Sequence, residues 1–160
     1  MTAPRILGVA VASGRVGYVL LAGSTLKDWH VSYTASKSPA KAAELAQKWI
    51  NQLEPDILVS EKVENAAKKS KRTKEIISAI ARTAEHNYLL DVSVVRAHDY
   101  ANKYEEASAL AKQYPEIQAW LPKKRRFFDN EPRNTVLFEA LSFADSVRRG
   151  GTVGLASMMG

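Results

Sequence analysis

The chain has no cysteine, no long apolar run and no leader-like start. Its 160 residues therefore offer no disulfide, no thiolate metal ligand and no cysteine nucleophile. No apolar stretch approaches the roughly 18 residues that a membrane helix needs. The residues after Met1 also lack the basic and then apolar order of a signal peptide. These absences predict a cytoplasmic protein without a membrane partner.

The composition predicts one globular domain. Hydrophobic residues make up 46% of the chain, which is typical of globular proteins. A chain of 160 residues can bury a core without cross-links. We expect residues 1–150 to form this domain, and residues 151–160, which show no strong pattern, to form a flexible tail.

The order of apolar patterns predicts the fold class. Short β-branched runs at 5–12, 16–21 and 26–33, joined by glycine turns, predict three antiparallel strands. Further on, helical spacing alternates with short apolar runs. The expected helices cover 39–53, 73–87, 99–113 and 129–148, the last ended by Gly150–Gly151, and the expected strands cover 57–60 and 92–95. This predicts an α/β fold with a five-stranded mixed sheet, three antiparallel strands and then two parallel ones, flanked by helices.

Three segments carry a resemblance to a known family. They are Ile6–Ala12 followed by Val16–Tyr18, Pro55–Glu61, and Glu139–Ala144. In this order and spacing they resemble motifs of the RuvC-like Holliday-junction resolvases, and the similarity extends from residue 5 to about 149. The resemblance implies a ribonuclease H-like fold and a metal-dependent endonuclease acting on branched DNA or RNA. It also implies Mg²⁺ or Mn²⁺ held by carboxylates, and a homodimer.

The resemblance places acids at two of the family's metal-binding positions. Glu61 lies at the exit of the fourth strand and Glu139 in the last helix, and both are predicted as catalytic residues and metal ligands. Ala10 stands where the family carries its first-strand aspartate, and Val136 stands where a further acid is common. Because alanine cannot bind a cation, the bridging ligand of a two-metal mechanism is missing.

Three explanations of Ala10 stay open. Asp129, Glu131 or Glu64 substitutes as a metal ligand; or the alanine is an engineered replacement; or the chain is a catalytically inactive nucleic-acid-binding or scaffold module. The acids also have ordinary interpretations. Glu61 and Glu139 suit surface ion pairs, and Asp129 and Glu131 suit the start of a helix.

The basic residues predict an anionic partner. The formal net charge is +6, and nine of the 23 basic residues lie in two segments. The predicted nucleic-acid-binding residues are Lys68, Lys69, Lys71, Arg72, Lys74, Lys103, Lys123, Lys124, Arg125 and Arg126. The first segment follows Glu61, where phosphates would lie beside a phosphodiester site, although a solvated charge run is the ordinary alternative. The second adjoins Trp120 and Phe128, which suit either base stacking or docking onto the core.

Overall fold

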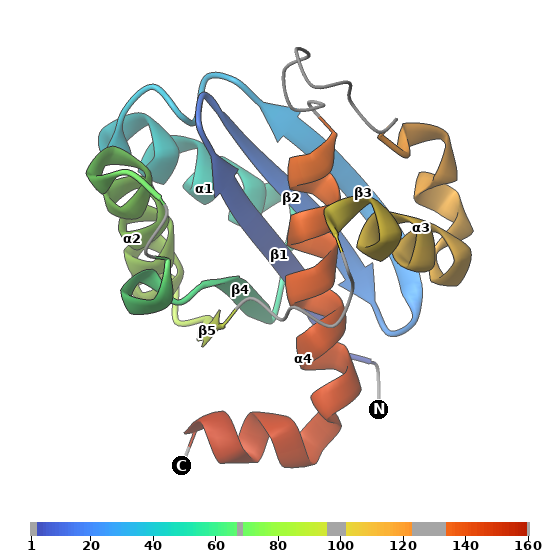
Figure 1. Ribbon diagram of the computed structural model, residues 1–160. Helices are drawn as coiled ribbons and strands as arrows, with labels where there is room; N and C mark the ends of the chain where they lie inside the picture. Colours follow the sequence, from blue (N-terminus) through green and yellow to red (C-terminus); the bar gives the residue numbers. More distant parts are fainter. Residues whose placement is uncertain (1–2, 67–68, 96–101, 123–133, 160) are drawn as a thin grey trace.

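Five strands form one mixed sheet in the order β3-β2-β1-β4-β5 (Figure 1). The computed structural model describes residues 3–66, 69–95, 102–122 and 134–159, except for the side chains of Asn65 and of residues 151–159. None of the described helices has the length and apolarity of a membrane span.

The first three strands form an antiparallel meander, as predicted. They are β1 (Arg5–Ala12), β2 (Arg15–Ala22) and β3 (Thr25–Ser32). The turns between them contain Gly14 at φ +78° and Gly23 at φ +60°, a backbone region that other residues rarely adopt. Apart from their end residues, β1 and β2 are buried along their whole length because both faces of the sheet are covered.

Two parallel strands complete the sheet. β4 (Ile57–Glu61) pairs with β1, and β5 (Leu90–Val94) pairs with β4. Every residue of β4 is buried, which is typical of a parallel strand covered on both faces. The predicted mixed sheet is therefore confirmed.

Helices cover the two faces of the sheet and create two separate cores (Figure 1). One face carries α1 (Pro39–Leu53) and α2 (Lys71–His86), and the other carries α3 (Lys103–Gln113) and α4 (Thr135–Met159). Two 3₁₀ turns, η1 (Val63–Asn65) and η2 (Pro115–Trp120), lie in the connections.

The α4 backbone lies directly on β1 and β2. A Cβ atom on Gly8 would collide with the backbone oxygen of Ala140, and one on Gly17 would lie 2.9 Å from Val136 Cγ1. Only glycine permits this approach at these positions. The close contact buries Ala10, which is 1% exposed, and holds the first turns of α4 over the end of β1.

Capping residues explain where α2 and α3 begin. α2 begins at Lys71, two residues before the predicted start, because Ser70 Oγ accepts a hydrogen bond from the Thr73 amide. α3 begins at Lys103 and not at residue 99, because Asn102 Oδ1 accepts from the amides of Tyr104 and Glu105. Residues 99–101 lie outside the described part of the chain.

The predicted end of the last helix is wrong. α4 runs through Gly150 and Gly151 to Met159. A glycine inside a helix costs only about 1 kcal/mol relative to alanine, so a glycine pair does not by itself end one. The flexibility of residues 151–160 and the domain boundary at residue 150 stay predictions.

Candidate functional site

The ends of β1 and β4 carry the positions that the resemblance singled out. Gly8 pairs with Val59 in the parallel register, and two more residues along each strand set Ala10 beside Glu61. Both residues are on the face covered by α4, and Glu61 is only 7% exposed. Glu139 reaches the same place from α4, so the structure brings the two predicted acids together.

Lys69 lies between the two acids. Its Nζ atom is 3.3 Å from Glu61 Oε1 and 3.2 Å from Glu139 Oε1. It also donates a hydrogen bond of 2.6 Å to the backbone oxygen of Val11, at the end of β1. Three oxygens from three different elements thus surround one ammonium group.

The local backbone holds Lys69 in this position. Its amide donates to the backbone oxygen of Ala66, and the next residue, Ser70, caps α2. Its side chain is 20% exposed, whereas the side chains of Glu61 and Glu139 are 8% and 11% exposed. Charges this far from water interact strongly, and each depends on its partner for compensation.

The described residues do not fit a two-magnesium centre. They contain no group of three or more acidic or histidine side chains able to hold a metal ion. Ala10 supplies no ligand, and the ammonium of Lys69 lies between the two carboxylates. Glu64 is exposed on η1, and Asp129 and Glu131 lie outside the described residues. Mg²⁺ needs near-octahedral oxygen ligands, so no metal-dependent step is derived from these residues.

A cavity of about 780 Å³ opens beside this cluster. Its lining residues are Val11, Ala12, Ser13, Arg15, Lys69, Ser70, Thr73, Asn102, Lys103, Tyr104, Thr135, Val136 and Glu139. Three of them are cationic and one is acidic. The helices α2, α3 and α4 all begin at this lining. Helix N-termini carry partial positive charge, so the cavity suits an anion with many oxygen atoms.

The cavity also contains two buried hydroxyl groups. Tyr104 Oη and Thr135 Oγ1 are buried and have no hydrogen-bond partner among the described residues. Buried hydroxyl groups are normally paired, so these two are exceptions in residues that line the cavity. None of Thr135, Arg15 and Tyr104 was predicted from the sequence. The spacing of apolar residues along the sequence predicts which positions are in the core, but it says little about which residues line a cavity.

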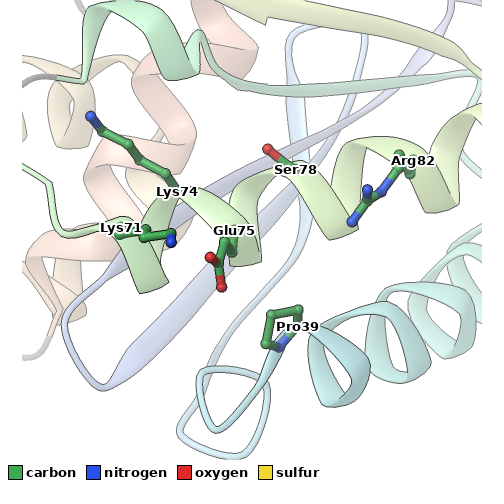
Figure 2. Close-up of a pocket in the computed structure, with 6 residues that line it drawn as sticks. All are labelled: Pro39, Lys71, Lys74, Glu75, Ser78 and Arg82. Carbon is green, nitrogen blue, oxygen red and sulfur yellow. The ribbon is translucent and has the colours of Figure 1, made fainter.

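The first predicted basic segment is divided among different surfaces. Lys69 enters the acid cluster, whereas Lys71 and Lys74 line a separate hollow of about 430 Å³ with Pro39, Glu75, Ser78 and Arg82 (Figure 2). In Figure 2, Lys74 points away from Pro39, while Glu75 points toward it. Arg72 donates to the backbone oxygen of Lys37 and lines a third hollow of about 350 Å³. Helix geometry causes this division, since successive residues turn by about 100°.

The remaining basic predictions have two outcomes. Lys103 lines the main cavity, at the start of α3. Lys68, Lys123, Lys124, Arg125 and Arg126 lie outside the described residues.

Trp120 packs against β3 and is 40% exposed. Its ring lies edge-on to Trp29 of β3, with centroids 5.1 Å apart, and its backbone oxygen accepts from Asn134 Nδ2. This contact supports the docking interpretation of Trp120. Phe128 lies outside the described residues.

A second ionic cluster joins η2 and α3 to α4, away from the cavity. Asp145 Oδ1 accepts hydrogen bonds from Tyr114 Oη at 2.6 Å and from Gln113 Nε2 at 3.0 Å. Arg148 and Arg149 form ion pairs with the same carboxylate at 3.2 and 2.7 Å. Burial and the hydrogen bond to Asp145 raise the pKa of Tyr114 to about 12. This cluster fixes α4 and therefore the position of Glu139.

Solved structures share this fold. The Thermus thermophilus RuvC structure matches with a TM-score of 0.64 and 14% identity, covering 91% of this chain and 96% of that one. T. thermophilus RuvC in complex with a Holliday junction substrate matches with a TM-score of 0.62 and 15% identity, covering 92% of this chain and 97% of that one. The yeast mitochondrial Holliday junction resolvase Ydc2 matches with a TM-score of 0.52 and 9% identity, covering 97% of this chain and 86% of that one.

Comparisons at the sequence level give no relative. No protein-family model matches the chain, and no curated protein matches it significantly. The structural matches show that the chain has a ribonuclease H-like, RuvC-like fold, which confirms the prediction from its motifs.

Proposed function

We propose that this chain binds branched DNA at the cavity between α2, α3 and α4 and does not cleave it by a two-magnesium mechanism. The observation that carries the proposal is the convergence of three cationic side chains and three helix N-termini on one cavity of about 780 Å³. One of the structural neighbours is a RuvC bound to a Holliday junction substrate, which supports branched DNA as the ligand.

Physical chemistry favours phosphate groups at this cavity. Arg15 and Lys103 line it from β2 and α3, and Lys69 lines it from the segment before α2. Cationic side chains release the counterions of DNA when they contact phosphates, and this release supplies most of the salt-dependent affinity.

The acid cluster argues against standard cleavage. A two-metal mechanism stabilises the attacking and leaving oxygens with two ions held by shared carboxylates. Here Ala10 contributes no ligand and the Lys69 ammonium lies between Glu61 and Glu139. Binding without cutting is the function that this arrangement supports best.

Binding is tested with a fluorescent four-way DNA junction and a linear duplex of the same arm sequence. We expect the junction to bind more tightly, with an affinity that falls steeply as salt rises. Lys103→Ala should reduce the slope of log affinity against log salt by about one. Lys48→Ala is the matched control, because it removes the same charge from the exposed surface of α1 on the opposite face of the sheet.

Three results would overturn the proposal. Binding that does not depend on salt would support a scaffold role instead. A clear preference for a structured RNA of the same shape would reassign the ligand. Cleavage of the junction with Mn²⁺, lost in Glu139→Gln, would show a competent endonuclease with a ligand from outside the described residues.

A further inference from the structure

We infer that the Lys69 ammonium is the resident cation of the Glu61–Glu139 pair, and that it keeps divalent metal out of a site that becomes a metal site when Lys69 is removed. This goes beyond the proposed function, because it concerns what the acids bind. It stands whether or not the chain binds DNA.

Oxygen atoms from three elements surround the ammonium of Lys69. Its Nζ donates hydrogen bonds to the Val11 backbone oxygen at 2.6 Å and to Glu139 Oε1 at 3.2 Å, and Glu61 Oε1 lies 3.3 Å away as an ion-pair partner. These oxygens belong to Val11, Glu61 and Glu139, at the ends of β1 and β4 and in α4. The separations fit an ammonium group, whereas Mg²⁺ requires ligand oxygens at about 2.0–2.1 Å.

Glu61 provides a second, independent sign that this position is built for a cation. The residue is 7% exposed, and its Oε1 atom has no hydrogen-bond partner among the described residues. The Lys69 ammonium lies 3.3 Å from this oxygen as an ion pair, without the geometry of a hydrogen bond. A buried carboxylate oxygen with coordination capacity left over is a ligand available to a positive ion.

Tethering favours the lysine over a free metal ion. Lys69 is held close to the acids by its own chain, and a tethered group competes at an effective concentration of roughly millimolar or more. A divalent ion must displace it and then find enough oxygen ligands. Ala10, adjacent to Glu61, offers no ligand, so the ammonium of Lys69 is favoured over a divalent ion at this position.

The test is a titration with Mn²⁺ alone, followed by electron paramagnetic resonance and calorimetry, without DNA. We expect no saturable binding to the natural chain at millimolar Mn²⁺. Lys69→Ala should bind one Mn²⁺ per chain with an affinity roughly tenfold or more above that of the natural chain, because a positive charge next to the site is gone. The double variant Lys69→Ala, Glu139→Gln should lose that binding.

The controls separate charge from structure. Lys69→Arg keeps the positive charge and should stay without metal, and Lys48→Ala should behave as the natural chain does. If Lys69→Ala does not fold, the titration of the natural chain tests the inference instead. Saturable Mn²⁺ binding by the natural chain that is lost in Glu61→Gln would overturn it. A folded Lys69→Ala that binds no Mn²⁺ overturns it as well. Neither result depends on whether the junction binds.

Discussion

Two ionic clusters on α4 are built in opposite ways. At the cavity, the ammonium of Lys69 contacts two carboxylates, and Glu61 Oε1 has no hydrogen-bond partner among the described residues. The second cluster has one carboxylate, Asp145, which accepts hydrogen bonds from Tyr114, Gln113 and Arg148 and forms ion pairs with two arginines. Both acids of α4 in these clusters are largely buried, so burial alone does not distinguish them.

The difference identifies which cluster is structural. A buried acid whose oxygens are all engaged contributes to stability and has no capacity left for a ligand. A buried acid such as Glu61, with one oxygen that has no hydrogen-bond partner among the described residues, keeps capacity for a cation. We therefore assign the Asp145 cluster to holding α4 in place and the Lys69 cluster to the site.

The largest effect is expected for Asp145→Ala. Its removal leaves Tyr114 Oη buried without its acceptor and leaves two arginines without their anion. The buried hydroxyl left without its acceptor and the loss of ion pairs to two partly exposed arginines together cost about 2 kcal/mol in the free energy of unfolding. Urea denaturation measures the loss, with Asp145→Asn as the variant that retains part of the hydrogen bonding. A loss below about 1 kcal/mol would remove the distinction between the clusters.

Asp91 of β5 is a third partly buried acid, and it differs from the two clusters because its charged neighbour is another acid, Glu85. Burial and then the charge of Glu85 raise the pKa of Asp91 to about 6. The folded state therefore holds a proton more tightly than the unfolded state, so stability falls as the pH rises from about 4 to about 6.

Asp91→Asn should remove this pH dependence. At pH 7 the variant should be more stable than the natural chain by about 1 kcal/mol, allowing for solvent screening of this partly buried group. The gain should vanish near pH 4, where both forms are neutral. Urea denaturation across this pH range measures it, and a gain that is the same at pH 4 would contradict the assigned cause.

The smallest effect is expected for Glu139→Gln. The change leaves Lys69 paired with Glu61, and the amide oxygen can still accept a hydrogen bond from Nζ. We expect the free energy of unfolding to change by less than about 1 kcal/mol. A loss of unfolding free energy close to that of Asp145→Ala would show that Glu139, like Asp145, serves to hold the fold together.

The fold could be predicted because its signals are local. Glycine turns, a switch from alternating to helical spacing and a wholly apolar β4 determine the strand order and its parallel part. Helix ends were less predictable, because Ser70 and Asn102 cap helices inside polar segments and because α4 continues through two glycines. The homodimer and the cytoplasmic location stay predictions.

The site was only partly predictable. Resemblance identified Glu61 and Glu139, and their meeting place follows from the parallel register of β1 and β4. Lys69 was predicted to contact phosphate, but its position between the acids depends on a turn with no periodic pattern. Arg15 and Thr135 line the cavity from elements far apart in the chain, so no local motif marks them.

The most direct test of the central claim measures binding of the four-way junction by the natural chain in EDTA and again with Mn²⁺. If Lys69 is the cation of the site, the affinity should be the same in both conditions after correction for ionic strength, and the junction should stay intact. Binding that requires Mn²⁺, or strand cleavage that begins when Mn²⁺ is added, would contradict the account.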